Sequence, residues 1–112
     1  MNQLEKDRLI ERFMGWRLVL KSNIGWVFVN DAGYELSIIT YRDSIIGFTT
    51  DWNWLIKALY KFNNLSVNDN PLNGQSYVYH CDQINYAVTL YNINDAVNAL
   101  CEGIEWYNST LN

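Results

Sequence analysis

The sequence predicts a small α+β domain over residues 1–112, with one antiparallel sheet of about five to six strands and three helices packed mainly on one face. Three observations predict this class. Apolar residues recur at helical spacing in three segments, and apolar and polar residues alternate in the segments between them. Short polar turns join the alternating segments, which favours antiparallel pairing. The predicted order is α-β-β-β-(β)-α-β-β-α, with the fourth strand left open.

The first helix is predicted over residues 3–14. Leu9 and Phe13 are four residues apart, so they lie on one side of a helix, and charged residues cover the rest of its surface. Gly15 is expected to end this helix, because glycine adopts the left-handed conformation that follows many helix C-termini.

Alternation predicts the strands of the sheet. Before the second helix they are expected over residues 16–21, 24–30, 34–41 and, as the open fourth strand, 44–49. Ser22-Asn23 is expected to form the first turn between them. After a polar loop over residues 64–74, two more strands are expected over 75–81 and 84–91. In these strands Tyr77 and Tyr79 share one face, because side chains alternate along a strand.

Two further helices are predicted over residues 52–62 and 94–108. Thr50 or Asp51 is expected to cap the earlier helix and Asn94 the later one, since their side-chain oxygens accept from free amides of the first turn. The closing helix carries one continuous apolar stripe and is the element on which the rest of the chain packs. Gly103 interrupts it at a cost of about 1 kcal/mol relative to alanine, which indicates close packing at that position. Trp106 lies beside the stripe and is expected to cover the edge of the core.

Composition limits the classes of function. The formal charge is −4 and the pI is about 4.7, which disfavours a surface that binds phosphates. Five Trp and eight Tyr supply more ring surface than a small core hides, so some rings are expected to face a partner. The two cysteines are expected to be free thiols, as in a reducing cytosol. No stretch resembles a signal peptide or a membrane span of about 20 apolar residues, which predicts a cytoplasmic protein without membrane contact.

The strongest candidate for catalysis is the pair His80-Cys81. On a strand these side chains point to opposite faces, so they are poorly placed to share a proton. His80 is the only histidine, and no cysteine cluster replaces the missing metal ligands. The sequence also lacks phosphate-binding and nucleophile-elbow motifs. We therefore predict no catalytic residue, no metal and no cofactor, and keep a Cys-dependent enzyme as an alternative.

Candidate binding residues are exposed aromatic residues and one arginine, which provide contact area at a small cost in side-chain entropy. They are Trp26, Tyr41, Arg42, Tyr77 and Tyr79. Tyr41-Arg42 also places an aromatic residue beside a basic one, as RNA-binding sheets do, but no RNP-like pattern surrounds it. Direct RNA contact is therefore a minor alternative.

Three short patterns carry a resemblance to a known group of proteins. They are Phe-Met-Gly at residues 13–15, D-W-N-W-L at 51–55 and I-E-W-Y-N at 104–108. In this respect the chain resembles small proteins of unknown function that are encoded by phages and prophages of Bacteroidetes. The resemblance carries over no catalytic residue.

The resemblance implies a phage-derived protein in the host cytoplasm that modulates a host or defence complex without catalysis. An inhibitor similar to anti-CRISPR proteins is the most concrete form of this hypothesis. Its expected partner is a host protein or a ribonucleoprotein complex. The alternatives are a minor structural phage protein or one that self-associates, so a homo-oligomer stays open.

Overall fold

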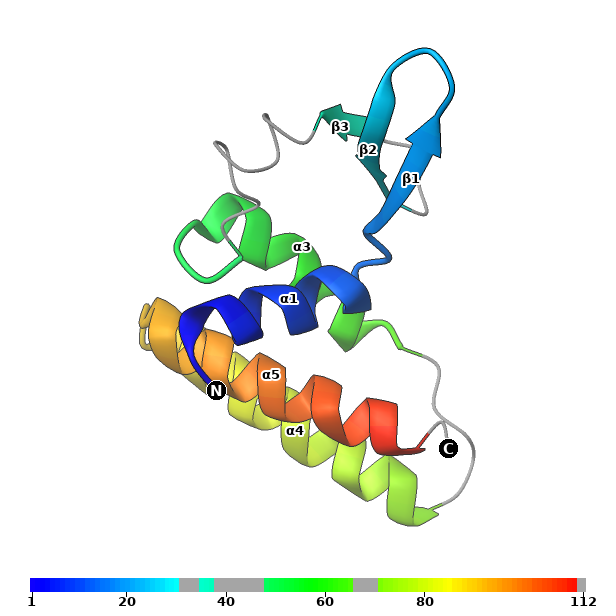
Figure 1. The fold of residues 1–112 in the computed structure, drawn as a ribbon. Coiled ribbons are helices and arrows are strands. Elements are labelled where there is room, and N and C mark those ends of the chain that lie inside the picture. The colour runs from blue at the N-terminus through cyan, green and yellow to red at the C-terminus, as the bar shows by residue number, and fades with distance from the viewer. Residues whose placement is uncertain (31–34, 38–47, 66–70, 111–112) are drawn as a thin grey trace.

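Helices dominate the architecture. The computed structural model describes residues 1–30, 35–37, 48–65 and 71–110 (Figure 1). The described helices are α1 (Gln3–Phe13), α3 (Trp52–Asn63), α4 (Pro71–Thr89) and α5 (Ile93–Thr110), and the strands are β1 (Arg17–Lys21), β2 (Gly25–Val29) and β3 (Glu35–Ser37). The strands form one antiparallel sheet in the order β1-β2-β3. The predicted α+β class with five to six strands is therefore wrong.

The main correction concerns α4, which replaces the two strands predicted over residues 75–81 and 84–91. Tyr77, Cys81, Ile84 and Val88 recur at helical spacing, and all four pack in or against the core. This packing overrides the β-propensity of the aromatic and β-branched residues in the segment. Pro71 is the first residue of the helix, a position where its fixed φ and missing N–H do no harm.

The predictions for the early strands have mixed outcomes. The first two strands are confirmed as β1 and β2, and three residues of the third form β3. The other residues of 34–41 lie outside the described residues, as do 44–47 of the open fourth strand. Phe48 and Thr49, at the end of that segment, form a buried turn rather than a strand.

Helix ends follow capping rules. Gly15 has a φ of +81° and ends α1 as predicted. Asp51 caps α3, where its carboxylate accepts from the N–H of Asn53 at 2.9 Å. The cap of α5 is Asn92, which accepts from the N–H of Asp95 at 3.1 Å, so the prediction of Asn94 is wrong by two residues. Tyr91, just before this cap, has a φ of +54°.

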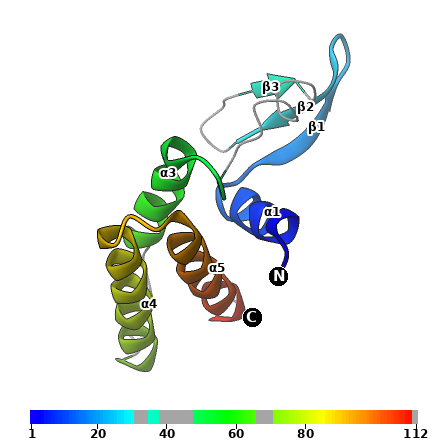
Figure 2. The ribbon, with the colours of Figure 1, turned by 90° about the vertical axis from the view of Figure 1, so that its left-hand side faces the viewer.

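The core forms where α5 packs between α1 and α4, with α3 across one end of the group (Figure 2). This arrangement confirms α5 as the central element. Gly103 of α5 faces the ring of Phe62 of α3, which is fully buried. A Cβ at Gly103 would lie 2.7 Å from Cζ of that ring, so the predicted close packing is confirmed.

A buried carboxylate fixes α1 to the segment that precedes α3. Thr49 donates to Asp7 through its N–H and through its hydroxyl, each at 3.2 Å. Gln3 donates in turn to the Thr49 hydroxyl at 3.1 Å. Burial raises the pKa of Asp7, and the two hydrogen bonds from Thr49 oppose this shift.

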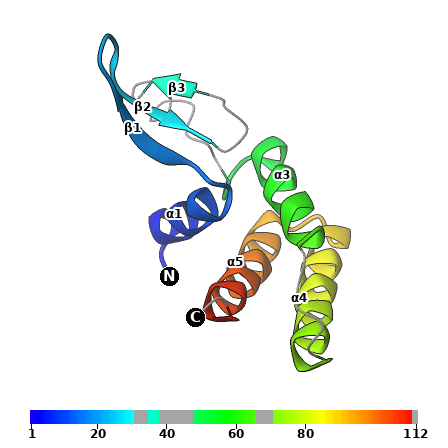
Figure 3. The same cartoon turned by 90° about the vertical axis from the view of Figure 1, so that its right-hand side faces the viewer.

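The sheet projects from the helical body as an arm beside α1 and α3 (Figure 3). A three-residue loop joins β1 to β2, with a turn bond from the N–H of Ile24 to the carbonyl of Lys21 and a φ of +89° at Gly25. The turn predicted at Ser22-Asn23 is therefore confirmed, and Gly25 takes a left-handed conformation that glycine adopts without steric cost. The arm makes the molecule elongated, with a radius of gyration of 15.1 Å, whereas a compact chain of this length has about 13 Å.

Candidate interaction surfaces

The side chains of His80 and Cys81 do not form a nucleophile and base pair. They are consecutive residues of α4, where neighbours are about 100° apart around the axis. The His80 ring packs on Trp106, with ring centroids 5.3 Å apart, and burial lowers the pKa of the imidazole while Glu102 opposes this shift. Burial raises the pKa of the Cys81 thiol, which reduces the fraction of reactive thiolate.

Both cysteines are free, as predicted. Cys101 is buried against the core, and burial raises the pKa of its thiol to about 12. Among the described residues, no group of three or more His, Cys, Asp or Glu side chains could hold a metal ion. Within the same residues, no helix is both long and apolar enough to cross a membrane.

A row of aromatic rings joins α4 to the rest of the core. Tyr77 stacks on Trp106 at 6.2 Å between centroids and tilts against Phe62 at 5.6 Å. The Tyr77 hydroxyl donates to the carbonyl of Phe62 at 2.6 Å in the C-terminal turn of α3, where the N–H of Leu65 donates to the same carbonyl at 3.2 Å. Burial raises the pKa of Tyr77 to about 12. Trp106 thus covers the core edge, as predicted, and Tyr77 ties α3 to α4.

The structure separates the five residues predicted to bind a partner. Trp26 is 51% exposed on β2, and Tyr79 is 57% exposed on α4. β2 and α4 lie on opposite sides of α1 and α3, so these two residues do not share a surface (Figure 1). Tyr77 is half-buried in the aromatic row described above. Tyr41 and Arg42 lie outside the described residues.

The tip of the arm presents apolar side chains to solvent. Leu20 and Trp26 are directly opposite each other on β1 and β2 and therefore share one face of the sheet. Leu20 is 62% exposed, and Ile24 in the connecting loop is 68% exposed. We call Leu20, Ile24 and Trp26 the arm tip. Sequence reasoning identified Trp26 but missed its two neighbours, because aliphatic residues in an alternating strand are usually buried.

The outer face of α4 presents a second apolar surface. Tyr79 and Tyr86 are seven residues apart on α4, and Leu90 follows four residues later in the turn after the helix end, so all three align on one side. They are 57%, 66% and 55% exposed, whereas Ile84 on the opposite side is fully buried. We call these three residues, with Asp82 beside them, the α4 outer face. From the sequence alone, the spacing of these residues was interpreted as the alternation of two strands, over 75–81 and 84–91.

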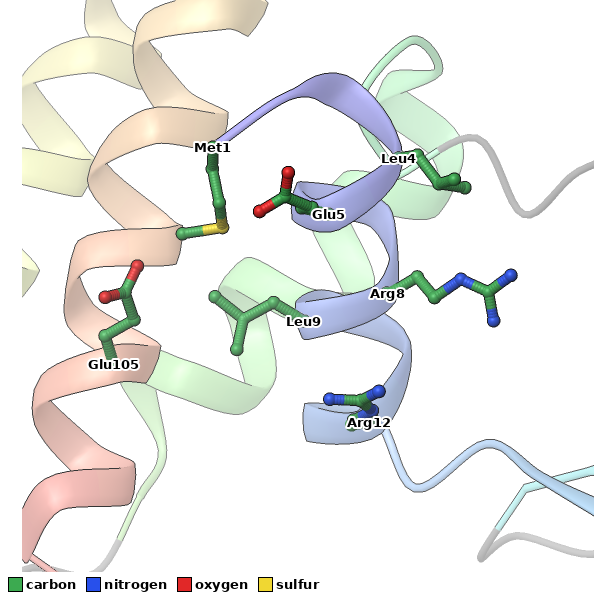
Figure 4. A pocket seen from close by; sticks show the side chains of 7 residues that line it. All are labelled: Met1, Leu4, Glu5, Arg8, Leu9, Arg12 and Glu105. Carbon is green, nitrogen blue, oxygen red and sulfur yellow. The ribbon is translucent and has the colours of Figure 1, made fainter.

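A groove of about 390 Å³ lies between α1 and α5 (Figure 4). Leu9 and Met1 point toward α5, and Glu5 and Glu105 lie on its two sides. Arg8 points away from α5 into solvent. The groove is lined by carboxylates, arginines and apolar side chains without a directed set of polar groups, so it does not define a ligand.

Comparisons with known proteins give no relative from which a role could be transferred. No family model, curated protein or solved structure matches the chain.

Proposed function

We propose that this protein is a non-enzymatic, phage-derived binding protein that modulates a host or defence complex in the cytoplasm, acting as an inhibitor in the manner of anti-CRISPR proteins. The arm tip is the observation that carries the binding part of this proposal. The resemblance to phage and prophage proteins supplies the biological context, which is an analogy between short patterns.

The arm tip has the features of a protein-binding anchor. Leu20, Ile24 and Trp26 are each more than half exposed, although burial would remove their apolar surface from water. They lie at the end of a projecting hairpin, where they can enter a groove that a flat surface cannot reach. Tryptophan is enriched among the residues that dominate binding energy. The raised pKa of the Cys81 thiol supports a role without nucleophilic catalysis.

The test is affinity capture of tagged protein from a Bacteroidetes host lysate, with and without RNase, read by mass spectrometry. We expect one host or defence complex to be captured by the natural protein and lost with the Leu20→Ser/Trp26→Ser variant. Tyr60→Ser is the matched control, because Tyr60 is 72% exposed on α3 and lies outside the arm. Loss of capture on RNase treatment would assign RNA to the target.

Two results would overturn the proposal. Capture of nothing but the protein itself, with a dimer or larger species in native mass spectrometry, would favour the self-associating alternative. Equal capture by the natural protein and the arm variant, with unchanged circular dichroism, would show that the arm tip does not carry the binding.

A further inference from the structure

The α4 outer face differs from the solvent side of an ordinary surface helix. Such a helix carries polar residues on the side opposite its core stripe. Here Tyr79, Tyr86 and Leu90 occupy that side, and Ile84 and Val88 occupy the core side. α4 therefore carries large apolar or aromatic side chains on both sides, with Gln75, Asp82 and Gln83 also exposed on the outer side, although only the inner side packs against the protein.

Charged residues are distributed unevenly along the chain, and this distribution sets the electrostatic potential around the α4 outer face. All eight Lys and Arg residues lie within residues 1–61. Residues 62–112, which include α4 and α5, contain no basic residue and five acidic ones: Asp69, Asp82, Asp95, Glu102 and Glu105. A polyanion such as RNA would be repelled here, and so would the same face of a second copy.

The arrangement of the face matches the chemistry of arginine. Asp82 lies three residues after Tyr79 and four before Tyr86, so its carboxylate is placed within about one helical turn of each ring. A guanidinium that pairs with Asp82 can stack on a neighbouring tyrosine ring, because it is planar and weakly hydrated. Lysine forms the ion pair but lacks the planar group that stacks.

We propose that the α4 outer face is a docking site for an arginine-bearing segment of a partner protein. This inference rests on the proposed function, because it names the chemistry of the partner that a binding protein would need. It concerns a surface distinct from the arm tip. Tyr91 adjoins the face at the end of α4, where it is 88% exposed and held at a positive φ that tyrosine rarely adopts.

The first test uses peptides and the isolated protein, so it does not require the natural partner. A short alanine-based helical peptide that carries arginines is titrated into isotope-labelled protein, and amide shifts are followed by NMR. We expect the shifts to concentrate in residues 75–91. The same peptide with lysines should bind several-fold more weakly, and a polyuridine RNA should cause no shifts in this segment.

Matched variants separate specific docking from general attraction to an acidic protein. Tyr79→Ser/Tyr86→Ser should weaken arginine-peptide binding by about tenfold. Asp82→Asn should weaken it by about threefold, whereas Glu105→Gln, which removes the same charge from an exposed site on α5 beside α1, should not change it. Circular dichroism establishes that each variant is folded.

Equal effects of Asp82→Asn and Glu105→Gln, or equal affinity for the arginine and lysine peptides, would overturn the inference, since either result indicates unspecific attraction. Shifts in residues 75–91 on addition of RNA would overturn it in favour of nucleic acid. These failures are distinct from failure of the proposed function. A chain that captures a host complex but shows no arginine-peptide docking refutes the α4 site alone.

Discussion

Gly103 provides the sharpest test of how the helices pack. Replacement by alanine adds one methyl group to the middle of α5. In an open position this change stabilises a helix by about 1 kcal/mol. Here the new Cβ would lie 2.7 Å from Cζ and 3.0 Å from Cε2 of Phe62, well inside the usual carbon–carbon contact of about 3.5–4.0 Å. The substitution therefore gains helix propensity but incurs a steric clash with the Phe62 ring.

The Phe62 ring has little freedom to move away. It is fully buried, and the rings of Phe13 and Tyr77 pack beside it at centroid distances of 6.2 and 5.6 Å. Overpacking of this kind costs about 1–3 kcal/mol. After the helix gain is subtracted, Gly103→Ala should lower the free energy of unfolding by about 1 kcal/mol, or the melting temperature by about 4 °C for a chain of this length.

Gly74→Ala is the matched control, because Gly74 is also helical and a Cβ there meets no atom within 4 Å. Thermal and urea unfolding should show that Gly74→Ala stabilises by up to about 1 kcal/mol. The difference between the two variants then isolates the steric cost. Phe62→Leu should reduce that cost in a double-mutant cycle, since it removes Cζ. Equal stabilisation by both alanine variants would refute the packing argument.

The remaining predictions concern Asp7, Tyr91 and Cys81. Burial raises the pKa of Asp7, so the free energy of unfolding should fall as the pH rises from the unfolded pKa of about 3.9 through the folded pKa. Urea unfolding across pH should show this loss in the natural protein and not in Asp7→Asn. Tyr91→Gly should raise stability by about 0.5–1 kcal/mol by relieving the left-handed strain, whereas Tyr91→Ala should not, as thermal unfolding can show. Cys81 should react with a thiol-specific reagent at neutral pH more slowly than a small-molecule thiol of ordinary pKa does. Rapid labelling would instead favour the alternative of a Cys-dependent enzyme.

Sequence patterns correctly predicted the helix ends that are set by short-range backbone rules. Gly15 and Asp51 end and begin helices through backbone rules that depend on a few neighbouring residues. The cap of α5 was misplaced because Asn92 and Asn94 both suit that position, and the left-handed turn at Tyr91 decides between them. That turn cannot be read from the sequence, since tyrosine rarely adopts it.

The candidate surfaces were predictable only in part, and the reason is geometric. Trp26 and Tyr79 were expected to be exposed, and they are. Tyr77 was assigned to the same face as Tyr79, which would hold for a strand. On a helix the two side chains are about 200° apart, so Tyr77 enters the core while Tyr79 faces solvent.

The misreading of α4 and the proposed docking site have one physical origin. A helix with a polar outer side shows its period in the sequence, because apolar residues recur every three or four positions. In α4 the outer residues Tyr79 and Tyr86 carry large rings, as hydrophobic strands often do, and the inner residues Ile84 and Val88 are aliphatic, so the helical period is masked and short alternations remain. Both of these rings remain more than half exposed in the fold of the isolated chain. Such conflicts between local pattern and fold are expected at functional sites, and here the conflict falls on the face that we assign to an arginine-bearing partner.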